Sequence, residues 1–194
     1  MRTRTRLLAV LLPATLVALT VAPAARAGGS PPEAPSAKAD GNAAKAVAAY
    51  NEGVAKVRKA DAMGTVASKV YAFDYSARPD GKALREYEQA IADFARAVSL
   101  KPDHKESHNY LGYCYRRLGK LEHSLASYDK AIALDPGFAL AREYRGETYL
   151  ALGRVAEAEA ELVELRKVDA EQAAVLEQSL GLYRDREKQA ASGR

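Results

Sequence analysis

A spacing of 34 residues recurs along this sequence and limits the possible folds more than any other feature. The prolines Pro102 and Pro136 stand 34 residues apart. Other positions with matching residue types share this offset: Gly112 with Gly146, Tyr115 with Tyr149, Gly119 with Gly153, Ala90 with Ser124, Phe94 with Tyr128, and Ala97 with Ala131. A fixed period of this length indicates an array of repeated structural units, each of which packs on its neighbours.

Two amphipathic helices are predicted within one period. Apolar side chains recur at helical spacing, first in residues 104–118 and again in residues 121–134, which places them on one stripe of each helix. Gly119 stands where the first helix should end, and Pro136 should end the second. Asp103 and the third residue after it, Glu106, have the spacing of a capping box. Because two helices cannot cover both apolar stripes, such units should stack.

The order of the motif residues resembles the tetratricopeptide repeat (TPR) family. That family's pattern is W-x2-L-G-x2-Y, then A-x3-F, then P, within 34 residues. The corresponding positions here are His108, Leu111, Gly112, Tyr115, Ser124, Tyr128, Ala131 and Pro136. The resemblance implies an all-α fold, a short right-handed α-solenoid of about three TPR helix pairs plus a C-terminal capping helix.

The first repeat unit, residues 43–101, is predicted to be longer than the others. Its glycine-to-proline distance, from Gly53 to Pro102, is 49 residues, against 24 in the next unit. About 25 additional residues must therefore be inserted, and we place the insertion near residues 61–81. The second helix of the unit should start near Lys82.

The third repeat unit departs from the family pattern. Arg142 stands in the tryptophan position and Arg145 in the leucine position, as expected of a terminal repeat, which is often atypical. We expect the Arg145 guanidinium to reach solvent or an acid such as Glu161. Asp169 and Gln172 form a second capping box that opens a last helix. The predicted boundaries are 102–136 for the second unit, 137–169 for the third, 170–187 for the capping helix and 188–194 for a flexible tail.

The first 27 residues have the pattern of a secretory signal peptide. An apolar run, Leu7–Ala22, follows an arginine-containing start, and small residues at Ala25 and Ala27 suit a signal peptidase. An uncleaved membrane anchor is the alternative, but the run is short and contains Pro13. We therefore expect cleavage after Ala27, no membrane span afterwards, and a periplasmic or secreted protein.

The net charge of +4 belongs to this leader. Its four arginines are accompanied by no acid, and the remaining residues carry 25 basic and 25 acidic side chains. The absence of a basic excess argues against nucleic acid as a partner. Residues 28–42, rich in Gly, Pro, Ala and Ser, are predicted to be a disordered linker.

Few residues are candidates for chemistry. Cys114 is the only cysteine, and we predict an inert thiol in the core. His104 and His108 are four residues apart on one helix, but two ligands rarely make a metal site. No nucleophile elbow, phosphate loop or catalytic pair of carboxylates is recognisable. We therefore predict no enzyme activity, no cofactor and no metal.

The resemblance implies that a partner binds on the surface formed by the first helix of each pair. The predicted groove residues are Asn109, Tyr113, Arg116, Arg117, Glu143 and Glu147. Ordinary solvent-exposed helix surface is the alternative interpretation, and so is a contact surface of Tyr71, Phe73 and Tyr75 in the insertion.

The function predicted from the sequence is that of an exported, non-catalytic adaptor for another protein or peptide segment of the bacterial periplasm or cell envelope. An accessory factor that uses Cys114 or the His104/His108 pair is the alternative. Neither the partner nor the oligomeric state follows from the sequence.

Overall fold

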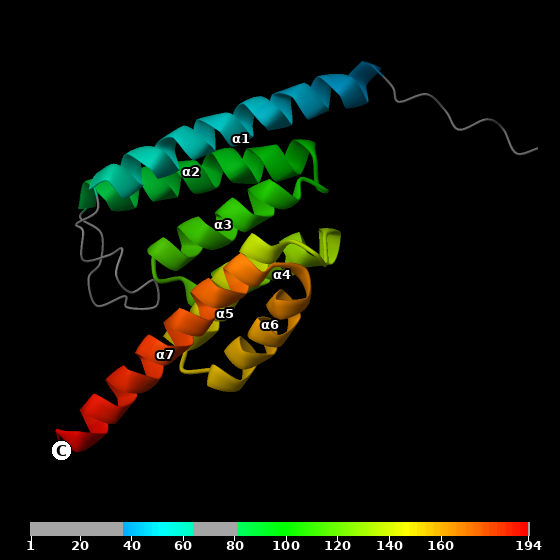
Figure 1. The fold of residues 1–194 in the computed structure, drawn as a ribbon. Coiled ribbons are helices and arrows are strands. Elements are labelled where there is room, and N and C mark those ends of the chain that lie inside the picture. The colour runs from blue at the N-terminus through cyan, green and yellow to red at the C-terminus, as the bar shows by residue number, and fades with distance from the viewer. Residues whose placement is uncertain (1–36, 64–80, 194) are drawn as a thin grey trace, which may run out of the picture. The chain divides into compact units, whose positions relative to one another are not determined.

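The computed structural model describes residues 37–63 and 81–193, and these residues form seven α-helices and no strand (Figure 1). The helices are α1 (Ala37–Met63), α2 (Gly81–Leu100), α3 (Lys105–Arg117), α4 (Leu121–Leu134), α5 (Ala139–Ala151), α6 (Val155–Val168) and α7 (Ala170–Ser192). None of these helices is both long enough and apolar enough to span a membrane.

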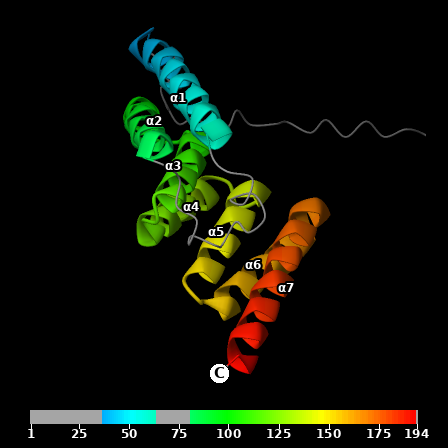
Figure 2. The same ribbon diagram turned by 90° about the vertical axis from the view of Figure 1, so that its left-hand side faces the viewer.

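Helices that follow one another in the chain pack against one another (Figures 1 and 2). The pairs α1–α2, α3–α4 and α5–α6 are the hairpins, and α7 packs on both α5 and α6. The first helices of the pairs also contact each other, α1 with α3 and α3 with α5, and α7 continues this series. We call α1, α3, α5 and α7 the inner row. The described helices thus have the predicted all-α solenoid arrangement.

Glycines allow the helices of a pair to approach closely. A Cβ atom at Gly53 would lie 2.7 Å from the ring of Phe94, and one at Gly112 would lie 2.5 Å from the ring of Tyr128. No larger residue could occupy either position without displacing the ring. In each of the first two units, the glycine of the first helix therefore packs directly against the aromatic ring of the second helix.

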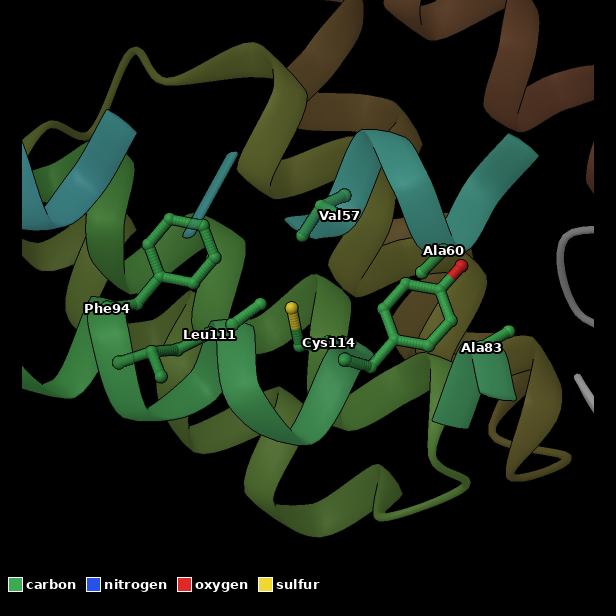
Figure 3. Packing of buried hydrophobic residues seen from close by; sticks show 8 residues of the cluster. Val57, Ala60, Ala83, Phe94, Leu111 and Cys114 are labelled. Atoms are coloured by element: carbon green, nitrogen blue, oxygen red, sulfur yellow. The ribbon is translucent and has the colours of Figure 1, made fainter. Parts of the chain in front are cut away.

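The first two units share a core of small and aromatic residues. Val57 and Ala60 from α1, Ala83, Tyr87 and Phe94 from α2, and Leu111 and Cys114 from α3 are all buried together (Figure 3). Burial of these side chains on three helices is the apolar contact that holds the first hairpin to the second.

In the third unit, the side chain that packs on the glycine comes from the following helix and not from the second helix of the pair. A Cβ atom at Gly146 would lie 2.6 Å from Leu176, which belongs to α7 and not to α6. Leu176 is fully buried together with Leu162 and Leu165 of α6. The last helix therefore contributes to the core of the third unit as well as covering it.

Some predicted boundaries and caps were wrong. Helix α1 starts at Ala37, inside the segment predicted to be a disordered linker, and α7 continues to Ser192, through most of the predicted flexible tail. The cap of α3 is His104, whose Nδ1 accepts from the backbone N–H of Ser107, and not Asp103. At α7 Asp169 is the cap, as predicted, since its carboxylate accepts two backbone N–H groups. The reciprocal half of the capping box is not formed, because the backbone N–H of Asp169 donates to the carbonyl oxygen of Leu165 and not to Gln172. The predicted signal peptide and the insertion aromatics lie outside the described residues.

Arg145 forms ion pairs with acidic residues on two other helices. Its guanidinium donates to Glu161 on α6, as expected, and also to Asp129 on α4 at 2.6 Å. Arg142 donates to the same glutamate at 3.1 Å. The arginines of the atypical unit thus use the carboxylate of Glu161 as a shared acceptor.

We expect Arg145→Leu to lower the free energy of unfolding by about 1–2 kcal/mol, because the buried Glu161 loses one charged hydrogen bond and keeps only that from Arg142. Chemical denaturation measures this loss. Arg154→Leu is the control, since Arg154 pairs with Glu157 at the surface, and it should leave stability unchanged. An unchanged or increased stability of Arg145→Leu would show that these contacts contribute nothing.

Candidate functional site

A groove of about 550 Å³ lies along the inner row. Its lining residues are Asp61 from α1, Tyr113, Arg116 and Arg117 from α3, Leu140, Glu143, Tyr144 and Glu147 from α5, and Gln172 and Val175 from α7. Leu140 and Val175 are 36% and 41% exposed, so apolar side chains border the groove on the side of α5 and α7. The groove is therefore a mixed surface in which charged groups lie beside aromatic and aliphatic ones.

The structure brings the six predicted groove residues together. Five of them line this groove, and Asn109 lines a smaller cavity of about 140 Å³ that shares Asp61, Tyr113, Leu140 and Tyr144 with it. That these residues contact a partner stays a prediction.

Arg116 is buried, contrary to the expectation of an open surface. It donates to Glu147, and the side chains of both residues are only 4% exposed. The guanidinium lies 4.8 Å from the ring centre of Tyr144 and 5.7 Å from that of Tyr113, within the range of cation–π attraction. Ser179 of α7 donates to the other oxygen of Glu147 at 3.2 Å. Arg116, Glu147 and Ser179 thus form an internal link among α3, α5 and α7.

Glu143 is a buried carboxyl group next to this ion pair. Burial raises the pKa of Glu143 to about 9, and the charge of Glu147 and a hydrogen bond to it act in the same direction, while Arg116 opposes them. Glu143 is consequently protonated at neutral pH, and its proton keeps two adjacent carboxyl groups from both being charged.

This raised pKa makes stability depend on pH. The folded protein holds a proton that the unfolded chain releases near the ordinary glutamate value of 4.5, so stability should fall as pH rises from there toward about 9. Glu143→Gln should remove this decline and melt at a higher temperature than the original protein at pH 8. At pH 4 the two proteins should melt alike.

Melting temperatures across this pH range test the prediction. The control is Glu171→Gln, a change at an exposed position on α7 that should leave the pH profile as it is. Parallel profiles for Glu143→Gln and the original protein would show that Glu143 is ionised in the folded state.

Asp61 is a central groove residue that the sequence analysis missed. Its Oδ1 accepts from the hydroxyls of Tyr87 at 2.5 Å and Tyr113 at 2.8 Å. Arg117 Nε donates to the Tyr87 hydroxyl at 3.1 Å, and its guanidinium lies 5.5 Å from the ring centre of Tyr87. A tyrosine-mediated chain therefore joins α1, α2 and α3. No motif marks Asp61, because it lies at the start of the predicted insertion, outside the repeat register.

Asn109 carries the most unusual polar atom of the site. The residue is 2% exposed, and its Oδ1 has no hydrogen-bond partner among the described residues. Leaving a buried acceptor without a donor costs about 1–3 kcal/mol. A bound group that supplies an N–H or O–H would remove that cost.

The family model described as tetratricopeptide repeat matches residues 82–139 and 115–167. Residues 82–167 are thus similar in sequence to tetratricopeptide repeats. The matched residues run from α2 to α6. A similar solved structure is "First TPR of Spaghetti (RPAP3) bound to HSP90 peptide SRMEEVD", with 16% identity, a TM-score of 0.49, and coverage of 68% of this chain and 92% of that chain. No curated protein sequence matches.

The other candidate residues for chemistry lie on α3 or at its N-terminal cap. Cys114 is fully buried, and this burial, with the nearby charge of Asp61, raises the pKa of its thiol. His104 Nδ1 lies 2.9 Å from the hydroxyl of Ser107, and His108 Nε2 lies 2.9 Å from the carbonyl oxygen of Pro102. Both imidazoles thus hold the start of α3. Among the described residues, no three potential ligand side chains form a metal-binding group.

Proposed function

We propose that this protein is an exported, non-catalytic TPR adaptor that holds a segment of another protein in the groove of the inner row. The observation that supports the proposal most is the groove itself. Four helices contribute to its walls, and buried polar contacts from Arg116 to Glu147 and from Ser179 to Glu147 fix three of them. Because the groove is already ordered, it loses little conformational entropy when a partner binds. More of the contact energy is then available for affinity.

The chemistry of the groove suits a polypeptide. Leu140, Val175 and the tyrosine rings offer apolar contact, while arginine and carboxylate groups lie next to them. Aromatic residues and arginine are the side chains that most often dominate protein–protein interfaces. A volume of about 550 Å³ accommodates a few residues of an extended chain, and not a whole domain.

The export part of the proposal rests on the N-terminal sequence. The arginine-containing start, the apolar run and the small residues at 25 and 27 are the features of a cleaved leader. Mass spectrometry of the protein from a producing cell should find Gly28 as its first residue. Retention of Met1 would contradict export by cleavage.

The alternative function, a thiol-based or metal-dependent accessory factor, has less support. The Cys114 thiol is enclosed by the core, and both histidines of the candidate pair serve the start of α3. Reactive thiols need an accessible, readily ionised group, which is the opposite of the environment of Cys114.

Photocrosslinking tests the adaptor function. A photoreactive amino acid at Leu140, in the groove, should give a discrete crosslinked partner in intact cells, and the same residue at Leu134 on α4 should not. Leu140 and Leu134 are similarly exposed, at 36% and 43%, and they differ in their position relative to the groove. Equal crosslinking at both positions, or none at Leu140, would contradict a partner in the groove.

A further inference from the structure

Helices α6 and α7 lie side by side at the C-terminal end of the stack and form a hollow of about 430 Å³ (Figures 1 and 2). The hollow is lined by Glu159, Leu162, Val163 and Arg166 of α6 and by Glu177, Leu180, Gly181 and Arg184 of α7. We call these residues the α6–α7 face. They are different residues from those that line the groove of the inner row.

The two helices bring the same charge pattern to this face. In each, a glutamate is followed seven residues later by an arginine, with a leucine and its neighbour between them. Arg166 near the end of α6 pairs with Glu177 of α7 at 2.8 Å, and Arg184 further along α7 pairs with Glu159 near the start of α6. The helices therefore run antiparallel, and acid and base alternate around the four corners of the face.

A face with alternating corners is complementary to itself. Consider a two-fold axis that lies in the plane of the face, parallel to the helices. It places α6 of one copy over α7 of the other, so that Glu159 lies over Arg184 and Arg166 lies over Glu177 of the second copy. Opposite charges that meet in this way favour one orientation of the two molecules. The four corner side chains are 48–60% exposed, so they can reach a second molecule.

The centre of the face has a projection and a hollow that fit the same symmetry. Val163 projects from α6 and is 51% exposed. On α7, a Cβ atom at Gly181 would meet no described atom within 4 Å. The two-fold rotation brings Val163 of each copy close to Gly181 of the other. In a two-fold interface a residue i contacts j and j contacts i, as this arrangement requires.

We propose that this protein forms a two-fold homodimer through the α6–α7 face, in which Val163 of each copy enters the hollow at Gly181 of the other and the corner glutamates and arginines pair between the copies. The proposal goes beyond the adaptor function, and each function can fail without the other. A dimer carries two inner-row grooves, so a partner with two binding segments would be held more tightly than by one copy.

Sedimentation equilibrium of the purified protein tests for the dimer. The protein should show a reversible monomer–dimer equilibrium over a range of concentrations. About 1 M salt should shift it toward the monomer, because the screening length falls to about 3 Å and the corner charges are exposed. A monomer at every concentration would overturn the proposal, and a dimer that salt leaves unchanged would overturn the pairing of the corners.

Charge exchange tests which face is used. An acidic variant, Arg166→Glu with Arg184→Glu, and a basic variant, Glu159→Lys with Glu177→Lys, should each fold, since exposed ion pairs contribute little to stability. Each alone should dimerise at least tenfold more weakly than the original protein, because like charges then meet. An equimolar mixture should form the mixed dimer. Dimerisation of the acidic variant by itself, or no association in the mixture, would overturn the proposal.

The matched control for the acidic variant changes two exposed basic residues on α2 and α4, Arg85→Glu with Lys130→Glu. This control alters the net charge by the same amount outside the α6–α7 face and should dimerise as the original protein does. Equal losses in the control and the acidic variant would show a general effect of net charge and overturn the assignment.

Gly181→Leu tests the hollow separately. Leucine favours a helix more than glycine does and meets open space here, so the helical melt of the diluted protein should be retained. The side chain fills the site that Val163 of the second copy needs, and dimerisation should weaken at least tenfold. Gly41→Leu is the control, because Gly41 of α1 also has open space at its Cβ position, and it should dimerise normally. Unchanged dimerisation of Gly181→Leu would overturn the proposed contact.

Discussion

Arg116→Ala is expected to lower the free energy of unfolding by about 3–5 kcal/mol, because it leaves the buried carboxylate of Glu147 without its counter-charge. The two side chains are each 4% exposed, and Ser179 alone cannot neutralise the charge that remains. The guanidinium also fills the space beside the rings of Tyr113 and Tyr144, so that its removal leaves a void as well. Urea denaturation followed by circular dichroism measures the change.

Two further variants separate the possible causes. Arg117→Ala removes the neighbouring arginine, which is only partly buried and pairs with no carboxylate of the described residues, and should cost much less. Arg116→Met combined with Glu147→Leu removes both charges and should recover most of the lost stability, since apolar replacement of a whole buried pair is often neutral. A loss below about 1 kcal/mol in Arg116→Ala would mean that Glu147 finds water or another donor.

This burial changes how the groove can be tested. Substituting glutamate for both Arg116 and Arg117 would damage the fold, because a negative charge would be placed beside Glu147 in the interior. Loss of partner capture in that double variant would say nothing about the groove surface. Arg117, which reaches the groove without a carboxylate partner among the described residues, is the suitable position.

Tyr128→Ala is expected to cost about 3–5 kcal/mol, as does the truncation of other large buried aromatic residues. Tyr128 is fully buried, and its ring covers Gly112 so closely that no Cβ fits between them. The cavity left by alanine lies between α3 and α4, where the glycine cannot extend to fill it. Thermal and chemical denaturation both report this loss.

Tyr128→Phe is the matched control, because it keeps the ring over Gly112 and removes only the hydroxyl. It should stay within about 1 kcal/mol of the original protein. A melting temperature of Tyr128→Ala equal to that of the original protein would be incompatible with the packing described above.

Much of the architecture could be predicted because it depends on local sequence. The 34-residue spacing of glycines and aromatic residues is a direct consequence of helix pairs that repeat the same close contact, as at Gly112 with Tyr128. The end of α3 could also be predicted, because Gly119, two residues after the helix, takes φ +72°, which glycine adopts without strain. Boundaries that depend on no such local signal, such as the start of α1 at Ala37, were less accurate.

The candidate site was predictable in part of its membership but not in its electrostatics. The repeat register places Asn109, Tyr113, Arg116, Arg117, Glu143 and Glu147 on the first helices of their pairs, and helices in stacked pairs bring those positions together. Register alone does not say how deeply a side chain is covered. Arg116 is enclosed by tyrosine rings from two helices and by Glu147, whereas Arg117, the next residue, is only partly buried.

The sequence by itself determined that the chain folds into stacked helix pairs, because periodic apolar stripes and close-packing glycines leave few other solutions. Only the tertiary structure decided which charges are interior and which are available. Burial depends on neighbours that are distant in sequence. Ser179 on α7 donates a hydrogen bond to Glu147, and Asp61 near the end of α1 accepts hydrogen bonds from the hydroxyls of two tyrosines, one on α2 and one on α3. The ionisation of Glu143 and the unmet acceptor of Asn109 follow from that burial, because the energy of a polar group is set by the atoms around it and not by its place in the chain.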